Sequence, residues 1–175
     1  SHGGLTDKGF HHFEEIQRIP FIVLMPESYY RNGRQPGDVL EERVSLVDVY
    51  PSILDWAGVD IDESNVHGHS IRPLLENESV DWRDNIFVEF FGVNSLVNTL
   101  ITARNGRYKY GWNCSSFDDL YDLQDDPYEV HNLINDPDHA GVVLEMRSVL
   151  EEWMVQQDFP GLGLYRRTRM RKFPY

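Results

Sequence analysis

A continuous run of apolar residues at 21–25 constrains the fold of this chain more than any other feature. The run reads Phe-Ile-Val-Leu-Met and is ended by Pro26. Apolar residues in succession, without alternation, are typical of a strand buried on both faces, as in the parallel sheet of an α/β protein. Residues 44–57 add apolar side chains at helical spacing. We expect a helix there that begins near residues 46–48, buries one face and ends at Gly58.

The sequence after about residue 80 has a different pattern. Residues rich in aromatic and β-branched types predict strands at 86–90, 97–103, 107–112 and 120–123. The pair Asn105-Gly106 separates two of these strands, which is a strong hairpin signal. Residues 140–157 predict a long helix, because their apolar side chains recur on one face. We therefore expect two parts: residues 1–80, the end of an α/β domain, and residues 81–175, a small α+β subdomain with an antiparallel sheet and one long helix.

Composition excludes some functions. The chain has 175 residues and a formal net charge of −13, which disfavours binding of nucleic acid through its overall field. The basic residues between 166 and 172 are interpreted as a surface tail or a clasp onto the protein's own acidic face. The one cysteine, Cys114, cannot form an internal disulfide. No apolar run approaches the length of a membrane span, so we expect none.

A glycine- and histidine-rich segment at residues 2–15 carries the strongest chemical signal. It contains Lys8, three histidines and three glycines, and it leads into Arg18-Ile19-Pro20 and the apolar run. Glycines let a backbone approach an anion closely, and lysine and histidine supply donors and positive charge for an oxyanion. The sequence therefore predicts an anion-binding loop ahead of a strand.

The order of the motifs resembles the sulfatase family of the alkaline phosphatase superfamily. In that family a loop of the form H-G-x-x-x-K-G-x-x-x-(Y/F)-E-E leads into R-(V/I)-P and a strand. Five segments of this chain match family motifs in the family's order: residues 2–15, 18–23, 44–58, 68–75 and 120–133. The last of these reads L-Y-D-L-x-x-D-P-x-E-x-x-N-L in both.

The resemblance implies a C-terminal portion of a formylglycine-dependent sulfatase, roughly its last third. Sulfatases make formylglycine from a C-x-P-x-R box, and Cys114 has no proline or arginine at the required offsets. We therefore expect the nucleophile and the aspartates that bind Ca²⁺ to lie upstream of Ser1, with no metal bound by this chain alone. The implied catalytic residue here is Lys8, which would bond a sulfate oxygen during S–O cleavage. Such a chain is expected to be inactive alone.

The histidines of the loop are candidate substrate-binding residues. His2 matches the family's H-G position, although a Ser-His start is also typical of a sequence left after tag removal. His11 and His12 are adjacent, so they are expected to point in different directions, with one of them facing the substrate. The alternative is that both are packed histidines with a structural role. Glu14 and Glu15 are interpreted as structural. His67 and His69 flank a glycine, but two histidines without a third ligand do not predict a zinc site.

Two alternatives stay open beside the sulfatase hypothesis. One is a phosphodiester or phosphonate hydrolase of the same superfamily, and the other is a non-catalytic structural or binding module. The expected partners are the N-terminal catalytic part of the enzyme and a sulfated small molecule or saccharide. Because a two-sided strand needs neighbours, an isolated piece is also expected to self-associate, as a possible homo-oligomer. The compartment stays open, since members of the family are periplasmic, secreted or lysosomal, and a cytoplasmic location is possible.

Overall fold

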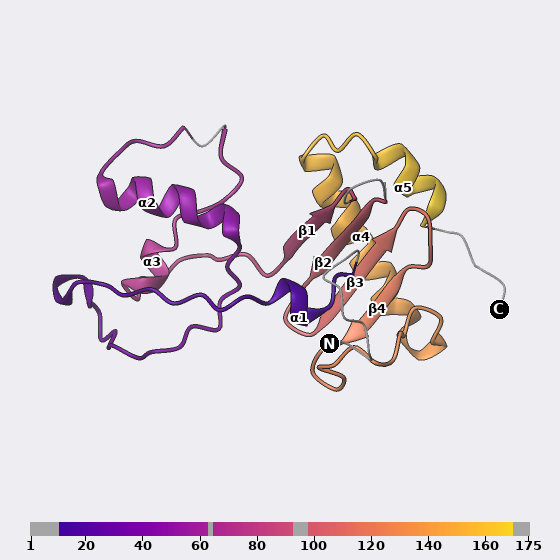
Figure 1. Ribbon diagram of the computed structural model, residues 1–175, viewed down its shortest axis with the longest axis horizontal. Helices are drawn as coiled ribbons and strands as arrows, with labels where there is room; N and C mark the ends of the chain where they lie inside the picture. Colours follow the sequence, from indigo (N-terminus) through magenta and orange to yellow (C-terminus); the bar gives the residue numbers. More distant parts are fainter. Residues whose placement is uncertain (1–10, 63–64, 93–97, 170–175) are drawn as a thin grey trace. The chain divides into compact units, whose positions relative to one another are not determined.

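The protein is described here from a computed structural model that covers residues 11–62, 65–92 and 98–169 (Figure 1). The described residues form two compact units by their contacts. One, called here the sheet unit, combines the residues up to Pro20 with those from Phe87 onward. The other, the helical unit, comprises Phe21–Ile86. The segment that precedes the apolar run thus packs with the C-terminal sheet, which is a grouping that the division at residue 80 did not include.

The sheet unit is built on four strands in the order β1-β2-β3-β4. They are β1 (Ile86–Phe90), β2 (Leu100–Arg104), β3 (Tyr108–Asn113) and β4 (Asp119–Asp122). The pairs β2–β3 and β3–β4 are antiparallel. The Asn105-Gly106 hairpin is confirmed: the Asn105 backbone N–H donates to the Tyr108 carbonyl at 3.0 Å, and its side-chain oxygen accepts from the Tyr108 N–H at 2.6 Å. The side-chain bond ties the turn to the start of β3 and so sets the register.

The two faces of this sheet have different partners. One face packs on the long helix α4 (Ala140–Gln156), which runs behind the strands in Figure 1, and on α5 (Leu162–Thr168). The fully buried side chains of this core are Ile101, Ala103, Tyr110, Trp112 and Leu120 from the strands, Met146, Leu150 and Met154 from α4, and Tyr165 from α5. Side chains alternate along a strand, so Thr102, Lys109 and Tyr121 lie on the other face. That face meets the segment that carries α1 (Glu14–Gln17).

The predicted helix at 140–157 is confirmed, and its buried residues Val143, Met146, Leu150 and Met154 follow helical spacing. The short helix α5 was not predicted. Its seven residues include two arginines and a glycine, so the sequence shows no apolar stripe there. Its one buried residue, Tyr165, packs edge-on against Trp112 at 5.3 Å between ring centroids. Two of the basic residues predicted as a tail or clasp, Arg166 and Arg169, do form a clasp, because both pair with Glu151 of α4.

The helical unit contains η1 (Glu27–Tyr29), η2 (Leu46–Asp48), α2 (Val49–Ala57) and α3 (Arg72–Leu75). The predicted start and end of the 46–57 helix are confirmed: a capping box between Ser45 and Asp48 precedes it, and Gly58 ends it in the left-handed conformation with φ of 66°. Asp48 joins three segments of the helical unit through its side chain. Its buried carboxylate accepts the Ser45 N–H at 2.7 Å and the His69 N–H at 2.9 Å, and it pairs with Arg83.

Two predictions for the helical unit are wrong for this chain. The apolar run 21–25 is not a strand among the described residues, and Ile22 and Leu24 are 90% and 91% exposed. The apolar face of the predicted helix is also open, with Leu46 66% and Tyr50 60% exposed. Both errors have one physical cause. Burial needs a covering surface, and the described residues of the unit supply none for these side chains. The run 21–25 therefore has no strand partners, and the apolar face of the helix stays exposed.

Gly68 allows the loop after α2 to touch the start of the helix. A Cβ at this position would lie 2.1 Å from the Val47 carbonyl oxygen, which is closer than any real Cβ contact. We therefore expect Gly68→Ala to separate the two segments and lower the free energy of unfolding by about 2–3 kcal/mol. Urea denaturation of the chain measures this loss.

The matched control is Gly141→Ala near the start of α4, where a Cβ meets nothing within 4 Å. This change should be neutral or stabilising by up to about 1 kcal/mol, because alanine is the better helix former. Equal destabilisation by the two changes would show that the close approach at Gly68 has no energetic consequence.

Candidate functional site

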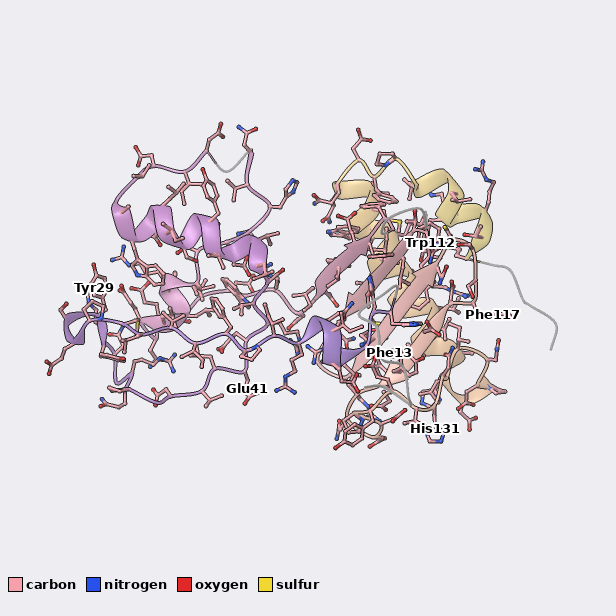
Figure 2. The ribbon with its side chains drawn as sticks, in the orientation of Figure 1. Phe13, Tyr29, Glu41, Trp112, Phe117 and His131 are labelled. Atoms are coloured by element: carbon pink, nitrogen blue, oxygen red, sulfur yellow. The ribbon has the colours of Figure 1, made fainter. Side chains whose placement is uncertain are left out.

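The segment that follows the predicted anion loop lies against the second face of the sheet. Phe13, labelled in Figure 2, precedes α1 and packs near the Tyr121 ring of β4 at 6.3 Å. The His12 carbonyl oxygen accepts a hydrogen bond from Lys109 Nζ at 2.7 Å, and the Glu14 N–H donates to Glu129 Oε2 at 2.6 Å. A cavity of about 60 Å³ lies between this segment and the sheet. Its lining is His11, His12, Phe13, Leu100, Thr102, Lys109, Gly111, Asn113, Asp119, Tyr121 and Glu129.

A buried group of charges underlies the segment, and it is called here the Lys109 cluster: Glu14, Arg104, Lys109 and Glu129. The Lys109 side chain is 3% exposed and that of Glu129 is fully buried. Lys109 Nζ lies 3.3 Å from Glu14 Oε1 and contacts Glu129 directly, and Arg104 reaches Glu14 at 3.2 Å. Burial raises the pKa of Glu129, while its bond to Lys109 opposes that rise. Two cations thus face two carboxylates, which is the balance that buried charges need.

His12 is held as a packed, neutral side chain. Its Nδ1 contacts the Thr102 hydroxyl, and its ring meets Phe90 edge-on at 6.2 Å. Burial, then the positive charge of Lys109 and then His11, lowers the pKa of His12 from 6.5 to about 4. At neutral pH this imidazole can donate or accept a hydrogen bond, but it carries no charge for an anion.

The low pKa of His12 predicts a pH dependence of stability. Between pH 6.5 and about 4 the unfolded chain binds a proton at His12 that the folded chain excludes, so this contribution is complete above pH 6.5 and is lost as the pH falls toward 4. We expect the stability advantage of the wild-type chain over His12→Asn to shrink across that interval in urea denaturation.

The comparison with a variant is necessary because Asp119 acts in the opposite direction. Burial, with the charges of Asp118 and Glu129, raises the pKa of Asp119 to about 6, so the folded state gains stability as the pH falls through that value. Subtracting the His12→Asn curve from the wild-type curve cancels this contribution. A difference that stays constant between pH 7 and pH 4 would contradict the assignment of a depressed pKa to His12.

The structure locates some of the predicted site residues. Lys8 and His2 lie outside the described residues. His11 stacks on the Phe13 ring at 5.4 Å, whereas His12 turns to Thr102, so the two histidines do point in different directions. Glu14 contacts Lys109 and Arg104 in the sheet. The use of His2, His11 and His12 as substrate ligands stays a prediction.

Sequence reasoning missed the residues of the sheet that hold the segment. Lys109 lies in β3 between Tyr108 and Tyr110, and a single lysine among strand aromatics reads as a solvent-facing position. The available signal was the alternation itself: aromatic residues at 108, 110 and 112 define the core face, so 109 must lie on a face that some other segment covers or leaves open. Glu129 gave a second signal, as the acidic residue of the D-P-x-E motif.

The described residues contain few side chains close enough together to share a metal ion. Across residues 11–62, 65–92 and 98–169, no group of three or more His, Cys, Asp or Glu side chains could hold a metal ion. His69 instead uses its backbone N–H to bond Asp48 and places its ring near Trp82. The Ca²⁺ ligands that the resemblance implies are expected upstream of Ser1, and the described residues supply no set of side chains for that ion. Within the same described part of the chain, no helix is long and apolar enough to cross a membrane.

Comparison with known proteins shows which class of protein carries this sheet and loop. Residues 1–156 match the family model described as N-sulphoglucosamine sulphohydrolase, C-terminal. An arylsulfatase of Clostridium perfringens is 31% identical over 140 residues, covering 79% of this chain and 28% of that protein. An N-acetylglucosamine-6-O-sulfatase of Bacteroides thetaiotaomicron is 29% identical over 160 residues, covering 87% of this chain and 27% of that protein.

Solved structures agree with these sequence matches. The structure of a 2-O GAG sulfatase superposes with a TM-score of 0.62 at 25% identity, covering 73% of this chain and 27% of that one. The phosphonate monoester hydrolase of Silicibacter pomeroyi superposes with a TM-score of 0.61 at 26% identity, covering 71% of this chain and 27% of that one. The fold is therefore that of the C-terminal part of sulfatase-like hydrolases.

The class that the fold and the motifs define is the sulfatases of the alkaline phosphatase superfamily. Within it, this chain belongs to the N-sulphoglucosamine sulphohydrolase C-terminal family. The chain spans only 28% and 27% of the length of the arylsulfatase and the N-acetylglucosamine-6-O-sulfatase that it matches. The expectation of a C-terminal sulfatase segment is thus confirmed.

Proposed function

We propose that the complete protein hydrolyses sulfate esters and that this chain contributes the anion-binding loop around Lys8. The observation that supports this most directly is the attachment of residues 12–14, at the C-terminal end of that loop, to the sheet by Lys109 and Glu129. A loop that orders charged donors around an anion needs a fixed support. The buried charges supply such a support at one end of the loop.

Lys8 is the proposed catalytic residue of this chain. Its ammonium group would bond a sulfate oxygen and stabilise the negative charge that develops there as the S–O bond breaks. His2 and His11 are proposed to contact the sulfated substrate. His12 is proposed to do so as a neutral hydrogen-bonding group, because burial lowers its pKa to about 4. The formylglycine nucleophile and the Ca²⁺ ligands are proposed to come from the N-terminal catalytic part, without which the chain is inactive.

Two exposed apolar features support that partner. Residues 21–25 have no strand neighbours among the described residues, and η2 and α2 together present Leu46, Tyr50 and Ile53 to solvent, each more than half exposed. A sheet edge and an apolar helix face are surfaces that a folded protein normally covers. We propose that the N-terminal catalytic part covers both, so that residues 1–80 complete the α/β domain and the run 21–25 becomes the strand that its sequence predicts.

The substrate class is proposed from relatives. Two relatives from Bacteroides thetaiotaomicron are named for sulfated sugars: one is an N-acetylglucosamine-6-O-sulfatase and the other a delta 4,5-hexuronate-2-O-sulfatase. A polar, multiply charged sugar suits a loop with several donors better than an apolar ester does. A sulfated saccharide is therefore the proposed substrate of the complete enzyme.

The test is a direct comparison of substrates with the full-length protein. We expect turnover of 6-O-sulfated and N-sulfated glucosamine, measured by sulfate release, to exceed turnover of a phosphate diester and of a phosphonate monoester by at least tenfold in kcat/KM. Preference for the phosphorus substrates would overturn the proposal in favour of the alternative below. Absence of all turnover, with tight binding of the sulfated sugar, would favour a binding module.

A phosphonate or phosphodiester hydrolase is the second candidate, and specific observations favour it. Two phosphonate monoester hydrolases superpose on this chain with TM-scores of 0.56 and 0.61. A multifunctional alkaline phosphatase superfamily protein of Trinickia caryophylli is 26% identical over 166 residues. These values are close to those of the sulfatases. A cationic loop that binds a tetrahedral oxyanion can also serve sulfur and phosphorus alike.

A further inference from the structure

Two separate parts of the sequence converge on the ammonium group of Lys109. Its Nζ donates to the His12 carbonyl oxygen, 97 residues away in sequence, and lies beside the carboxylates of Glu14 and Glu129. Glu129 then accepts the backbone N–H of Glu14, which is 115 residues away. One carboxylate and one ammonium group thus bind backbone groups two residues apart, and so fix the direction of the chain there.

The same short segment has further bonds to strand β2. The Glu14 carboxylate also pairs with Arg104, His12 contacts Thr102, and Gln17 donates to the Thr102 hydroxyl at 3.3 Å. These side chains come from the sheet face opposite the α4 core. A segment whose side chains are bonded from β2 and whose backbone is bonded from β3 cannot shift along the sheet without breaking several bonds at once.

Burial makes this attachment sensitive to each of its members. The side chains of Lys109, Glu129 and Glu14 are 3%, 0% and 14% exposed. Removing one partner of such a group leaves the other charge buried without compensation, so the remaining groups rearrange to reach water. The arrangement therefore resists small displacements as long as it is complete.

The attachment restricts where the predicted anion loop can reach. Lys8 precedes His12 by four residues, and four peptide steps span at most about 14 Å. The position of the His12 carbonyl consequently keeps the Lys8 backbone within about 14 Å of His12, whatever conformation the intervening residues adopt. A shift of about 1 Å in a charge-stabilising group can cost on the order of 100-fold in rate.

We propose that Lys109 and Glu129 are positioning residues for the reaction, which hold the backbone of residues 12–14 and thereby place Lys8 against the tetrahedral anion. The inference deepens the proposed function and rests on it. Neither side chain touches substrate: Lys109 acts through the His12 carbonyl, and Glu129 acts through the Glu14 N–H. The D-P-x-E motif, through Glu129, thus holds the end of the anion-loop motif in place.

The experiment is a double-mutant cycle in the full-length protein, with sulfate release as the readout. Lys109→Met is expected to lower kcat/KM about 100-fold, and Glu129→Gln about 10-fold, since the amide still accepts the Glu14 N–H. In the Lys8→Ala background the same changes should cost less than about threefold, because the group that they position is already absent. Lys109→Arg, which keeps the charge and the donors, should recover part of the activity.

The matched control is Arg166→Met, which also replaces a paired cation but at the exposed Glu151 pair of α5 and α4. It should leave kcat/KM within about twofold. Amide hydrogen exchange separates positioning from general unfolding: the Glu14 amide should exchange faster in Lys109→Met, whereas the amides of α4 keep their protection. If Lys109→Met does not fold, Glu129→Gln provides the cycle.

Equal costs of Lys109→Met with and without Lys8 would overturn the inference, as would unchanged exchange of the Glu14 amide. If the wild-type protein is active on sulfate esters but the costs of Lys109→Met and Lys8→Ala are additive, only the positioning role is refuted. A wild-type protein that is inert on sulfate esters would instead refute the proposed function, and the inference with it.

Discussion

Lys8→Ala in the full-length protein is expected to reduce kcat for sulfate ester hydrolysis by about 100- to 1000-fold. This is the typical consequence of removing one preorganised donor from a developing oxyanion, and it corresponds to about 3–4 kcal/mol of transition-state stabilisation. The effect should appear mainly in kcat, because charge on the sulfate oxygens is greatest in the transition state. Steady-state kinetics of sulfate release measures it.

Two further variants sharpen this prediction. Lys8→Arg keeps the charge but not the point geometry of the ammonium group, so partial activity is expected. Arg166→Met removes a cation from an exposed ion pair and should have little effect. If Lys8→Ala left turnover unchanged while ligand binding or assembly declined, the chain would be better described as a non-catalytic module.

Asp48→Ala is expected to destabilise the helical unit by about 3–5 kcal/mol. The Asp48 carboxylate is 1% exposed and is bonded by the Ser45 and His69 N–H groups and by Arg83. Its removal leaves a largely buried guanidinium group without its partner and two N–H donors without acceptors. Hydrogen exchange at the Ser45 and His69 amides reports the loss directly.

Asp38→Ala is the control for this change. Asp38 also accepts a backbone N–H, from Gln35 at 2.9 Å, and also pairs with an arginine, Arg34 at 3.5 Å, but its side chain is 37% exposed. Water can replace both bonds, so the cost should stay below about 1 kcal/mol. Similar costs at Asp48 and Asp38 would refute the view that burial makes Asp48 essential.

Local patterns predicted the sheet unit well. The Asn105-Gly106 hairpin, the strands around it and the helix that begins at Ala140 all formed as expected. Each of them is specified by nearest neighbours: an Asn-Gly turn whose asparagine side chain accepts the Arg107 and Tyr108 N–H groups, a period of two, or a period of 3.6. α5 was missed because a helix of seven residues with one buried side chain has no period to detect.

The same reasoning failed for the apolar run 21–25 and for the exposed face of α2. Their sequences describe surfaces suited to burial, and Ile22 and Tyr50 nevertheless face solvent in this chain. Hydrophobic pattern reports what a segment can bury against, but not whether the covering segment is present. The burial of the run 21–25 and of the α2 face depends on other segments that must pack against them, and the local sequence does not show whether those segments are present.

For the candidate site, the sequence placed the chain among sulfatases and predicted an anion loop with a lysine and histidines, which stays a prediction. It did not indicate that Lys109, Glu129 and Glu14 would meet, since each is an ordinary charged residue in its own segment and the three are distant in sequence. Residue types and their local spacing determined the elements and the chemistry on offer. Only tertiary structure decided which charges are buried together, because the strength of an ion pair depends on burial and distance, and both are properties of the folded chain.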